Sequence, residues 1–414
     1  MTDPRDLCVS GFGAIVLLLT GLTGCAWLGL PTVRGCWVAS AKPEPFVPVQ
    51  RVQRLIILGD LGANFEQRNV TLARALQRFL SVTPEASTAT QVLLLGDNFY
   101  PRGLVGTHGR CDPQQATPHA IQQQLEEVLE PFAFLRDMHI PVTAIAGNHD
   151  HGCGTMALEN QANPDRFLPP HQHWGALWNF HYGLPEAVTF ADTQVRLLLV
   201  DSEMVLRSRQ FLQASVQHLG RLLTEGEGRY RWQLLAAHHP LWTVGEHDGA
   251  FPAGIRKPLT FALFPVHFFA AAGFGPFVDL SQEAYSFRYM RYRRAVEHVL
   301  RRHPGSVNLL LSGHDHSLQL LKPKEAGLPF QLIVGSGAYC SPVRRGSEAT
   351  FAAAKHGFAV LDFSSDLFSV AFYGTTPCAD KEVCPKGTPE AYLLYQAVFR
   401  QVGPVEEFTA ERVF

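Results

Sequence analysis

The chain has 414 residues, of which 46% are hydrophobic and 17% charged. This composition excludes a disordered chain and is ordinary for a globular enzyme. The formal net charge is −2 and no run of Lys and Arg exceeds a pair, so we expect no nucleic-acid partner held by neutralised phosphates.

The first 25 residues predict a targeting or anchoring segment. Residues 11–22 form an apolar run of signal-peptide length and lead into Leu22-Thr23-Gly24-Cys25. That sequence is similar to the lipobox of bacterial lipoproteins, whose cysteine becomes the lipidated first residue. Ordinary cleavage and an uncleaved anchor are alternatives, because weak apolarity continues to Leu30.

Under each of these interpretations the rest of the chain is exported, and it is either anchored to a membrane of the cell envelope or secreted. Residues 26–51 contain four prolines and predict a tether between the targeting segment and the folded domain.

Strand-like apolar runs and helix-like apolar spacing alternate along most of the remaining chain. The predicted strands lie at 53–58, 91–95, 141–146, 195–200, 232–235 and 307–311. The predicted helices lie at 70–80, 118–131, 208–223 and 291–302. Two later segments, 358–363 and 367–373, alternate like antiparallel strands. This order predicts an α/β sandwich with mixed sheets and with ligands at the carboxyl ends of strands.

An aromatic insertion at about 250–288 interrupts this alternation. Its central part, 259–280, is strongly apolar but is broken by proline, glycine and histidine. A buried helical insertion or lid is one interpretation. A surface that docks on a membrane or a partner, and a true membrane span, are the alternatives.

Five short motifs each follow a strand-like run and carry acidic, amide, histidine or tyrosine side chains. They are GDLG (59–62), GDNFY (96–100), GNHDH (147–151), AHHP (237–240) and GHDH (313–316). These side chains are suitable ligands for two hard or borderline metal ions, and strand ends can bring them together. Because ligands spread from Asp60 to His316 must converge, residues 52–414 are predicted to form one catalytic domain.

The motifs resemble those of the calcineurin-like metallophosphoesterases, and most closely the purple (tartrate-resistant) acid phosphatases, from about Leu55 to Gly374. The usual first motif of the superfamily is Asp-x-His, but here Leu61 and Gly62 follow Asp60. The second motif instead supplies Tyr100, which the purple branch uses in compensation. The run HHPLWTVGEH is similar to that branch's HYPVWSxxEH. The resemblance implies a four-layer αββα sandwich of two mixed β-sheets flanked by helices.

The resemblance also implies a ligand set for two metal ions. Asp60, Tyr100 and His316 would hold a ferric ion. Asn148, His238 and His314 would hold a divalent ion, either Fe, Zn or Mn, and Asp97 would bridge the two ions. Phenolate and carboxylate oxygens favour the harder trivalent ion, whereas imidazoles and an amide suit the softer divalent one.

The implied activity is that of a binuclear acid phosphatase acting on small phosphate monoesters, in which a metal-bound hydroxide attacks phosphorus. His149 and His247 match two outer histidines of the branch, and either could protonate the leaving group. Asp150 and Asp315 are expected to orient ligand imidazoles. The pocket walls match nothing recognisable, so a phosphodiesterase or nucleotide pyrophosphatase remains an alternative. A lipid-anchored, non-enzymatic binding protein on the same fold is another.

Several other residues have simpler interpretations. His239 is expected to line the pocket or compete with His238, and His151 to line the rim. The pair His171 and His173 is expected on a surface loop. Gly335-Ser336-Gly337 is expected to pack its backbone closely beside the site.

The eight cysteines fit an exported protein without a disulfide scaffold. Cys111 and Cys153 follow two motif loops and could form a disulfide across the site rim. Cys378 and Cys384 could close a small loop, and Cys340 is expected to be a lone buried thiol. The natural substrate and the oligomeric state have no signature in the sequence.

Overall fold

The computed structural model describes ten segments of the chain. They are residues 53–62, 68–82, 90–106, 109–190, 194–248, 286–323, 325–344, 346–375, 391–400 and 409–411. The predicted targeting segment and tether, the aromatic stretch at 259–280 and the pair Cys378 and Cys384 lie outside these segments. Within the segments, no helix combines the length and the apolarity that crossing a membrane requires.

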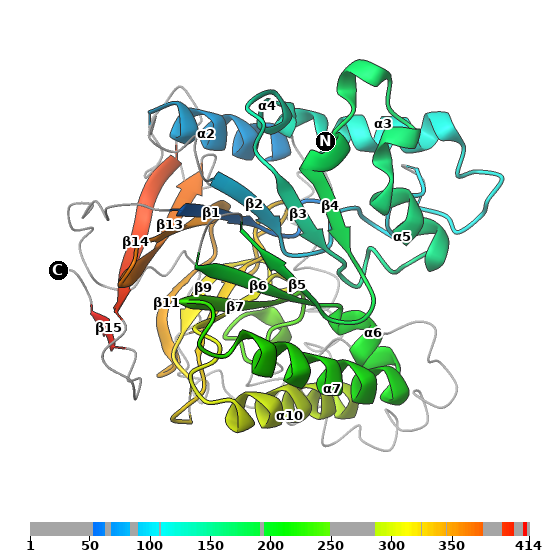
Figure 1. The fold of residues 1–414 in the computed structure, drawn as a ribbon. Coiled ribbons are helices and arrows are strands. Elements are labelled where there is room, and N and C mark those ends of the chain that lie inside the picture. The colour runs from blue at the N-terminus through cyan, green and yellow to red at the C-terminus, as the bar shows by residue number, and fades with distance from the viewer. Residues whose placement is uncertain are drawn as a thin grey trace, which may run out of the picture.

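Two mixed β-sheets form the centre of the described structure (Figure 1). The first sheet has the spatial order β15 (Thr409–Glu411), β14 (Ala391–Arg400), β13 (Leu367–Thr375), β12 (Gly357–Phe363), β1 (Gln53–Leu58), β2 (Thr90–Leu94), β3 (Val142–Ile145), β4 (Trp178–His181). The second has the order β11 (Ala349–Ala353), β9 (Leu318–Leu321), β10 (Phe330–Val334), β8 (Leu309–Ser312), β7 (Trp232–Ala237), β6 (Val195–Val200), β5 (Glu186–Thr189).

Each sheet has a parallel half, and this half determines where the motif loops lie. Strands β1, β2, β3 and β4 pair in parallel in the first sheet. Strands β6, β7, β8 and β10 do so in the second. All five motifs follow carboxyl ends of parallel strands, namely β1, β2, β3, β7 and β8. Since such ends meet at one edge of a sheet, the topology gathers the motifs.

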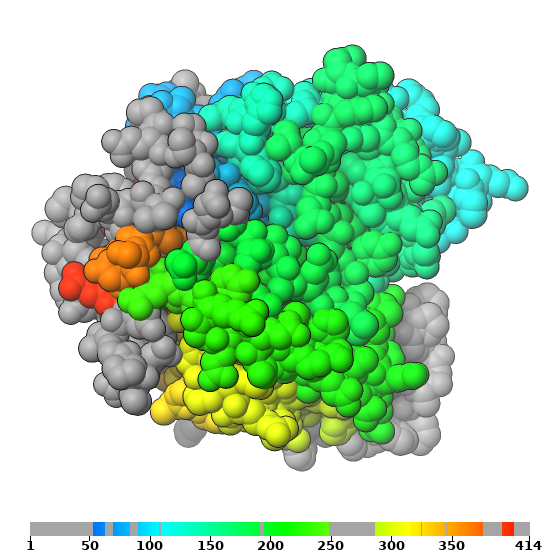
Figure 2. Space-filling model, viewed as in Figure 1, coloured from blue at the N-terminus to red at the C-terminus, as the bar shows by residue number. Residues whose placement is uncertain are grey.

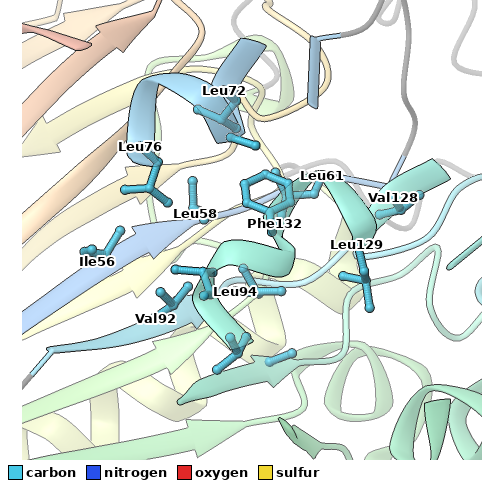
Figure 3. Packing of buried hydrophobic residues seen from close by; sticks show 14 of the residues in the cluster. Ile56, Leu58, Leu61, Leu72, Leu76, Val92, Leu94, Val128, Leu129 and Phe132 are labelled. Atoms are coloured by element: carbon cyan, nitrogen blue, oxygen red, sulfur yellow. The ribbon is translucent and has the colours of Figure 1, made fainter. Parts of the chain in front are cut away.

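Alternation along the strands divides the apolar core into layers. In β1, Leu55 and Ile57 belong to the cluster that fills the space between the sheets. Ile56 and Leu58 belong to the cluster under the outer helices of the first sheet, which Figure 3 shows together with Leu72 of α2. A strand buried on both faces reads as a continuous apolar run, as residues 55–58 (LIIL) of β1 do.

Helices cover the outer faces of both sheets (Figure 1). Along the chain they are α2 (Arg68–Val82), α3 (Pro118–Val128), α4 (Ala133–Asp137), α5 (Thr155–Ala162), α6 (Ser202–Arg207), α7 (Arg209–Gly226) and α10 (Phe287–Arg302). Helices α7 and α10 pack on the second sheet through a third apolar cluster, and Figure 2 shows them in green and yellow on the lower surface. Short 3₁₀ turns lie at Glu130–Phe132, Pro164–Arg166, Pro170–Gln172, Gly175–Leu177 and Glu246–Asp248.

The predicted fold class is confirmed: two mixed sheets lie face to face between helices. The predicted strands at 53–58 and 195–200 match β1 and β6 residue for residue. Thr117 caps α3 as expected, because its side chain accepts the Ala120 N–H. The last predicted helix starts earlier than expected, at Phe287, because Ser286 caps it by accepting the Tyr289 N–H.

Candidate metal centre

The motif loops turn sharply at the strand ends, and their backbones come very close together. Asp60, Asp97 and His314 all have positive φ angles, of 57°, 52° and 67°. Such angles are uncommon outside glycine and cluster at functional sites. Gly147 allows one such close approach, since a Cβ there would lie 2.3 Å from Asp97 Oδ1. The sharp turns aim the polar side chains at a common point.

One half of the site is rich in oxygen and is centred on Tyr100. Its phenol oxygen lies 3.2 Å from Asp60 Oδ1, 3.2 Å from Asp97 Oδ2 and 3.2 Å from His316 Nε2. His316 Nε2 lies a further 3.5 Å from Asp60 Oδ1. Tyr100 is partly exposed, whereas Asp60 is fully buried. The phenol oxygen, the two carboxylate oxygens and the imidazole nitrogen therefore converge on one point.

The other half is rich in nitrogen and is centred on the Asn148 amide oxygen. That oxygen lies 3.0 Å from His238 Nε2 and 3.2 Å from His314 Nδ1. His238 donates its Nδ1 proton to the Leu95 carbonyl at 2.7 Å, which turns Nε2 towards the site. Both histidines are buried, with 0% and 3% of their surface exposed.

Asp97 lies between the two halves. Its Oδ2 is 3.2 Å from the Tyr100 phenol oxygen and 3.4 Å from His238 Nε2. Its Oδ1 accepts the backbone N–H of His149 at 2.8 Å, which fixes the carboxylate plane. The position fits the bridging role that was predicted for Asp97.

The electrostatics follow from burial and from these short distances. Burial opposes the charged form of His238, but the Asp97 carboxylate outweighs burial and raises the pKa of His238 to about 10. Burial and the carboxylates of Asp97 and Asp60 raise the pKa of Tyr100 well above 10.0. Burial and the imidazole of His247 lower the pKa of His314 well below 6.5, so this ring is neutral.

The donor chemistry fits metal ions. A phenol has a single proton, yet its oxygen lies 3.2 Å from two carboxylate oxygens and from an imidazole nitrogen, and two imidazoles converge on one amide oxygen. Metal binding displaces protons from its ligands, so a cation would satisfy these contacts. Asp60, Asp97 and His238 place one potential ligand atom each within 4.8 Å of one another, as do His238, His239 and His314.

The two predicted proton donors lie at the rim. His149 donates Nδ1–H to the Pro101 carbonyl at 2.6 Å, and its Nε2 lies 3.9 Å from Asp97 Oδ2. The His247 ring stacks on the His314 ring, with centroids 4.2 Å apart. Both histidines are therefore beside the candidate ligands, and each is partly exposed.

We expected Asp150 and Asp315 to orient ligand imidazoles, but the hydrogen bonds described for them go to other groups, so this expectation is wrong. Asp150 accepts N–H groups of Asn98, Phe99 and Gly147, and so joins two motif loops. Asp315 accepts the backbone N–H of His247 at 3.0 Å. A buried carboxylate in a tight loop is best satisfied by backbone donors, which are more numerous there than imidazoles.

Two further expectations require correction. His151 is buried rather than at the rim, and its Nε2 lies 2.9 Å from an oxygen of Asp201. Burial opposes the charged form, but the hydrogen bond with Asp201 raises the pKa of His151. Cys340 is exposed rather than buried, because it follows the turn that carries Tyr339 over the site.

Three expectations around the site are confirmed. Cys111 and Cys153 form a disulfide, with Cα atoms 5.0 Å apart. His171 and His173 are exposed on a loop. The turn at 335–337 packs its backbone against the site, since a Cβ on its first glycine would lie 2.2 Å from the Asp315 carbonyl.

Sequence reasoning missed a buried polar layer behind the nitrogen-rich half. It consists of Asp201, Ser202 and Glu203, of which none exposes more than 1% of its surface. These residues follow β6 and begin α6. The signal was present, because an acidic side chain directly after a buried parallel strand is the pattern that identified the other motifs.

The sequence that forms this site and fold matches a known protein family. The family description "Calcineurin-like phosphoesterase" matches residues 53–318, which is more than half of the chain. The protein therefore belongs to the calcineurin-like phosphoesterases and is a phosphoesterase enzyme.

Relatives confirm the predicted resemblance to the tartrate-resistant acid phosphatases. Tartrate-resistant acid phosphatase type 5 of Rattus norvegicus is 24% identical over 267 residues, covering 60% of this chain and 71% of that protein. The Homo sapiens protein is 24% identical over 308 residues, covering 70% and 75%.

Two solved structures are also similar. A purple acid phosphatase from yellow lupin (Lupinus luteus) seeds has a TM-score of 0.47 and 13% identity, covering 78% of this chain and 51% of that one. A dimetal phosphatase from Danio rerio has a TM-score of 0.45 and 13% identity, covering 78% and 96%.

Proposed function

We propose that this phosphoesterase is a binuclear metal-dependent phosphatase that hydrolyses small phosphate monoesters. The observation that carries the proposal is the position of Asp97, whose Oδ2 lies 3.2 Å from one candidate ligand group and 3.4 Å from the other. A single carboxylate oxygen shared by two converging ligand groups is the arrangement that a bridging ligand requires. The similarity to tartrate-resistant acid phosphatases supports the monoester reaction.

The oxygen-rich half, with Asp60, Tyr100 and His316, would hold a ferric ion. The nitrogen-rich half, with Asn148, His238 and His314, would hold a divalent Fe, Zn or Mn ion. When bound, the two ions supply the positive charge that neutralises the phosphate and makes water a nucleophile near neutral pH.

The protein's own side chains supply the rest of the chemistry. His149 has its Nδ1–H committed to the Pro101 carbonyl, so its Nε2 is free to hold the proton that the leaving alkoxide needs. The His149 backbone N–H donates to Asp97 Oδ1, which couples the position of the proton donor to the bridging carboxylate. His247 stacks on His314 and would provide a second polar contact for the phosphate or leaving group.

The test is to purify the chain, measure its metal content by mass spectrometry, and compare p-nitrophenyl phosphate with bis(p-nitrophenyl) phosphate. Two metal ions per chain and faster monoester turnover support the proposal. Faster turnover of the diester would identify a phosphodiesterase or pyrophosphatase instead. A chain that binds metal but hydrolyses neither would favour a binding protein on the same fold.

We also propose that the domain is exported and attached to a membrane through its N-terminal segment. The disulfide Cys111–Cys153 supports an oxidising compartment, and the apolar run at 11–22 supports a targeting signal. Fractionation of cells that express the whole chain, with a Cys25→Ser variant, tests the lipid anchor. Recovery of both chains in the reduced cytoplasm would contradict the proposal.

A further inference from the structure

His239 is a fully buried histidine next to a candidate ligand, and the predicted ligand set does not use it. Its ring centroid lies 4.4 Å from that of His314 and 5.0 Å from that of His238. Since both neighbours belong to the nitrogen-rich half, any displacement of this ring displaces two candidate ligands. Dense packing transmits such shifts because the interior has little free volume.

The first turn of α6 holds the His239 ring from behind. His239 Nδ1 lies 2.8 Å from Ser202 Oγ, and its Nε2 lies 3.7 Å from Glu203 Oε2. Ser202 Oγ also accepts the backbone N–H of His239 at 3.0 Å. Arg207 donates to the other oxygen of Glu203 and thereby fixes that carboxylate. Both ring nitrogens of His239 are thus near partners on α6.

Helix α10 holds the backbone of the same residue. Tyr292 donates its phenol proton to the His239 carbonyl at 2.9 Å, and Tyr289 donates to the Pro240 carbonyl. Both tyrosines are buried, with at most 1% of their surface exposed. The position of His239 is therefore determined by two helices and by the end of β7.

The His314 ring is in contact with two other imidazoles. Its centroid lies 4.4 Å from that of His239 and 4.2 Å from that of His247, on which it stacks. The backbone of His314 is also in the uncommon left-handed region, with φ of 67°. A ring held in this way can keep its Nδ1 directed at Asn148 Oδ1 before any metal binds.

We propose that His239 is a positioning residue: supported by Ser202 and Glu203, it fixes the His314 ring and so increases the affinity of the nitrogen-rich half for its divalent ion. This inference rests on the proposed binuclear function. Groups that orient metal ligands typically change metal affinity ten- to a hundredfold. The packed ring is the operative part, so another aromatic residue of similar size should substitute for histidine.

The experiment is a metal titration of the full chain. The divalent ion is removed with a chelator, and Zn²⁺ and Mn²⁺ are then titrated back in competition with a chromogenic chelator. We expect His239→Ala to weaken binding about ten- to a hundredfold and His239→Tyr to retain most of the affinity. Ser202→Ala removes only the side-chain hydrogen bonds and should weaken binding about three- to tenfold.

His181→Gln is the matched control, because His181 is also buried and pairs with an acid, Glu186, at 3.1 Å. It should lower the melting temperature without changing metal affinity. Wild-type affinity in both His239→Ala and Ser202→Ala would overturn the inference and leave the binuclear proposal intact. Complete loss of the ion in His239→Tyr would make His239 a ligand and also overturn it. A wild-type chain that binds fewer than two ions would overturn the proposed function together with this inference.

Discussion

The two halves of the candidate metal centre differ in the chemistry of their donor atoms and in the surroundings of their histidines. In the oxygen-rich half, Tyr100 is partly exposed and 22% of the His316 side-chain surface is accessible. In the nitrogen-rich half, His238 and His314 are buried among other imidazoles. The first half offers hard oxygen donors, of which Tyr100 is partly exposed and Asp60 is buried, whereas the second offers two buried imidazole nitrogens and the partly exposed Asn148 amide.

This difference teaches how one site could select two different ions. In the oxygen-rich half, carboxylates surround a phenol, so under the proposed function selection there would depend on charge and favour a trivalent ion. In the nitrogen-rich half, the ring packing around His314 restricts ligand geometry, so selection of the proposed divalent ion would depend more on preorganisation. Asp97 connects the two halves, so we expect its loss to remove both metal ions.

The largest effect is expected for Asp97→Ala. Removal of the shared carboxylate should lower metal content in both halves and reduce p-nitrophenyl phosphate hydrolysis by about 10³-fold or more, since two bound metal ions would contribute several kcal/mol of transition-state stabilisation. Metal analysis and steady-state kinetics measure both quantities. Asp97→Asn keeps the shape and serves as the control for folding. Retention of one ion at full affinity would show that the halves are independent.

Tyr100→Phe should affect the oxygen-rich half alone. The ring contacts with His149 and Tyr339, at 4.3 and 5.6 Å between centroids, can remain, while the phenol oxygen is lost. We expect the visible charge-transfer band of a ferric phenolate to disappear and affinity for that ion to fall by about a hundredfold or more. Absorption spectra and metal analysis of both proteins provide the measurement. A colourless wild-type protein with two ions would remove the ferric assignment.

The rim histidines should differ in their sensitivity to the leaving group. His149→Asn should lower kcat by about 10²-fold for alkyl phosphates, whose leaving alkoxide needs a proton, and far less for p-nitrophenyl phosphate. His247→Asn is the comparison, because His247 stacks on His314 and should act mainly through binding of the phosphate substrate. A series of aryl and alkyl phosphates gives the dependence on leaving-group pKa. Equal slopes for wild type and His149→Asn would reject His149 as the proton donor.

The sequence was sufficient to predict that the candidate ligands lie close together, because they follow parallel strands. Asp60, Asp97 and Asn148 come after β1, β2 and β3, and the carboxyl ends of such strands must share an edge. The fold class followed from the same alternation of strands and helices. The local pattern alone predicted an α/β sandwich with mixed sheets and a common site, whereas the four-layer arrangement and the role of each ligand were implied by the family resemblance.

The supporting contacts could not be predicted in this way, because their partners are distant in sequence. Asp150 binds the backbone of Asn98, 52 residues away, and His151 binds Asp201, 50 residues away. Neither partner is indicated by apolar periodicity or motif spacing. Strands β9, β10 and β11 were missed as well, since their short apolar runs have no helical neighbours to mark their limits.

The smallest expected effect concerns stability, and it tests whether the polar layer at the start of α6 supports the fold rather than the metal ions. His151→Gln removes one partner of the buried pair with Asp201, and should reduce the free energy of unfolding by about 2 kcal/mol at pH 5.5. His151 has a raised pKa in the folded protein because the hydrogen bond and charge of Asp201 outweigh burial.

The sign of the pH dependence follows from that raised pKa. A group that binds its proton more tightly when folded contributes stability that is complete below its unfolded pKa of about 6.5. The contribution is lost as the pH rises through the folded pKa, so the difference between wild type and His151→Gln should shrink in alkaline solution. Denaturant unfolding of both proteins from pH 5.5 to 9 measures it. A difference that grows with pH would mean that His151 is buried in its neutral form. Loss of the divalent ion in His151→Gln would show that the pair of His151 and Asp201 positions the ligands of the nitrogen-rich half, the role that we propose for His239.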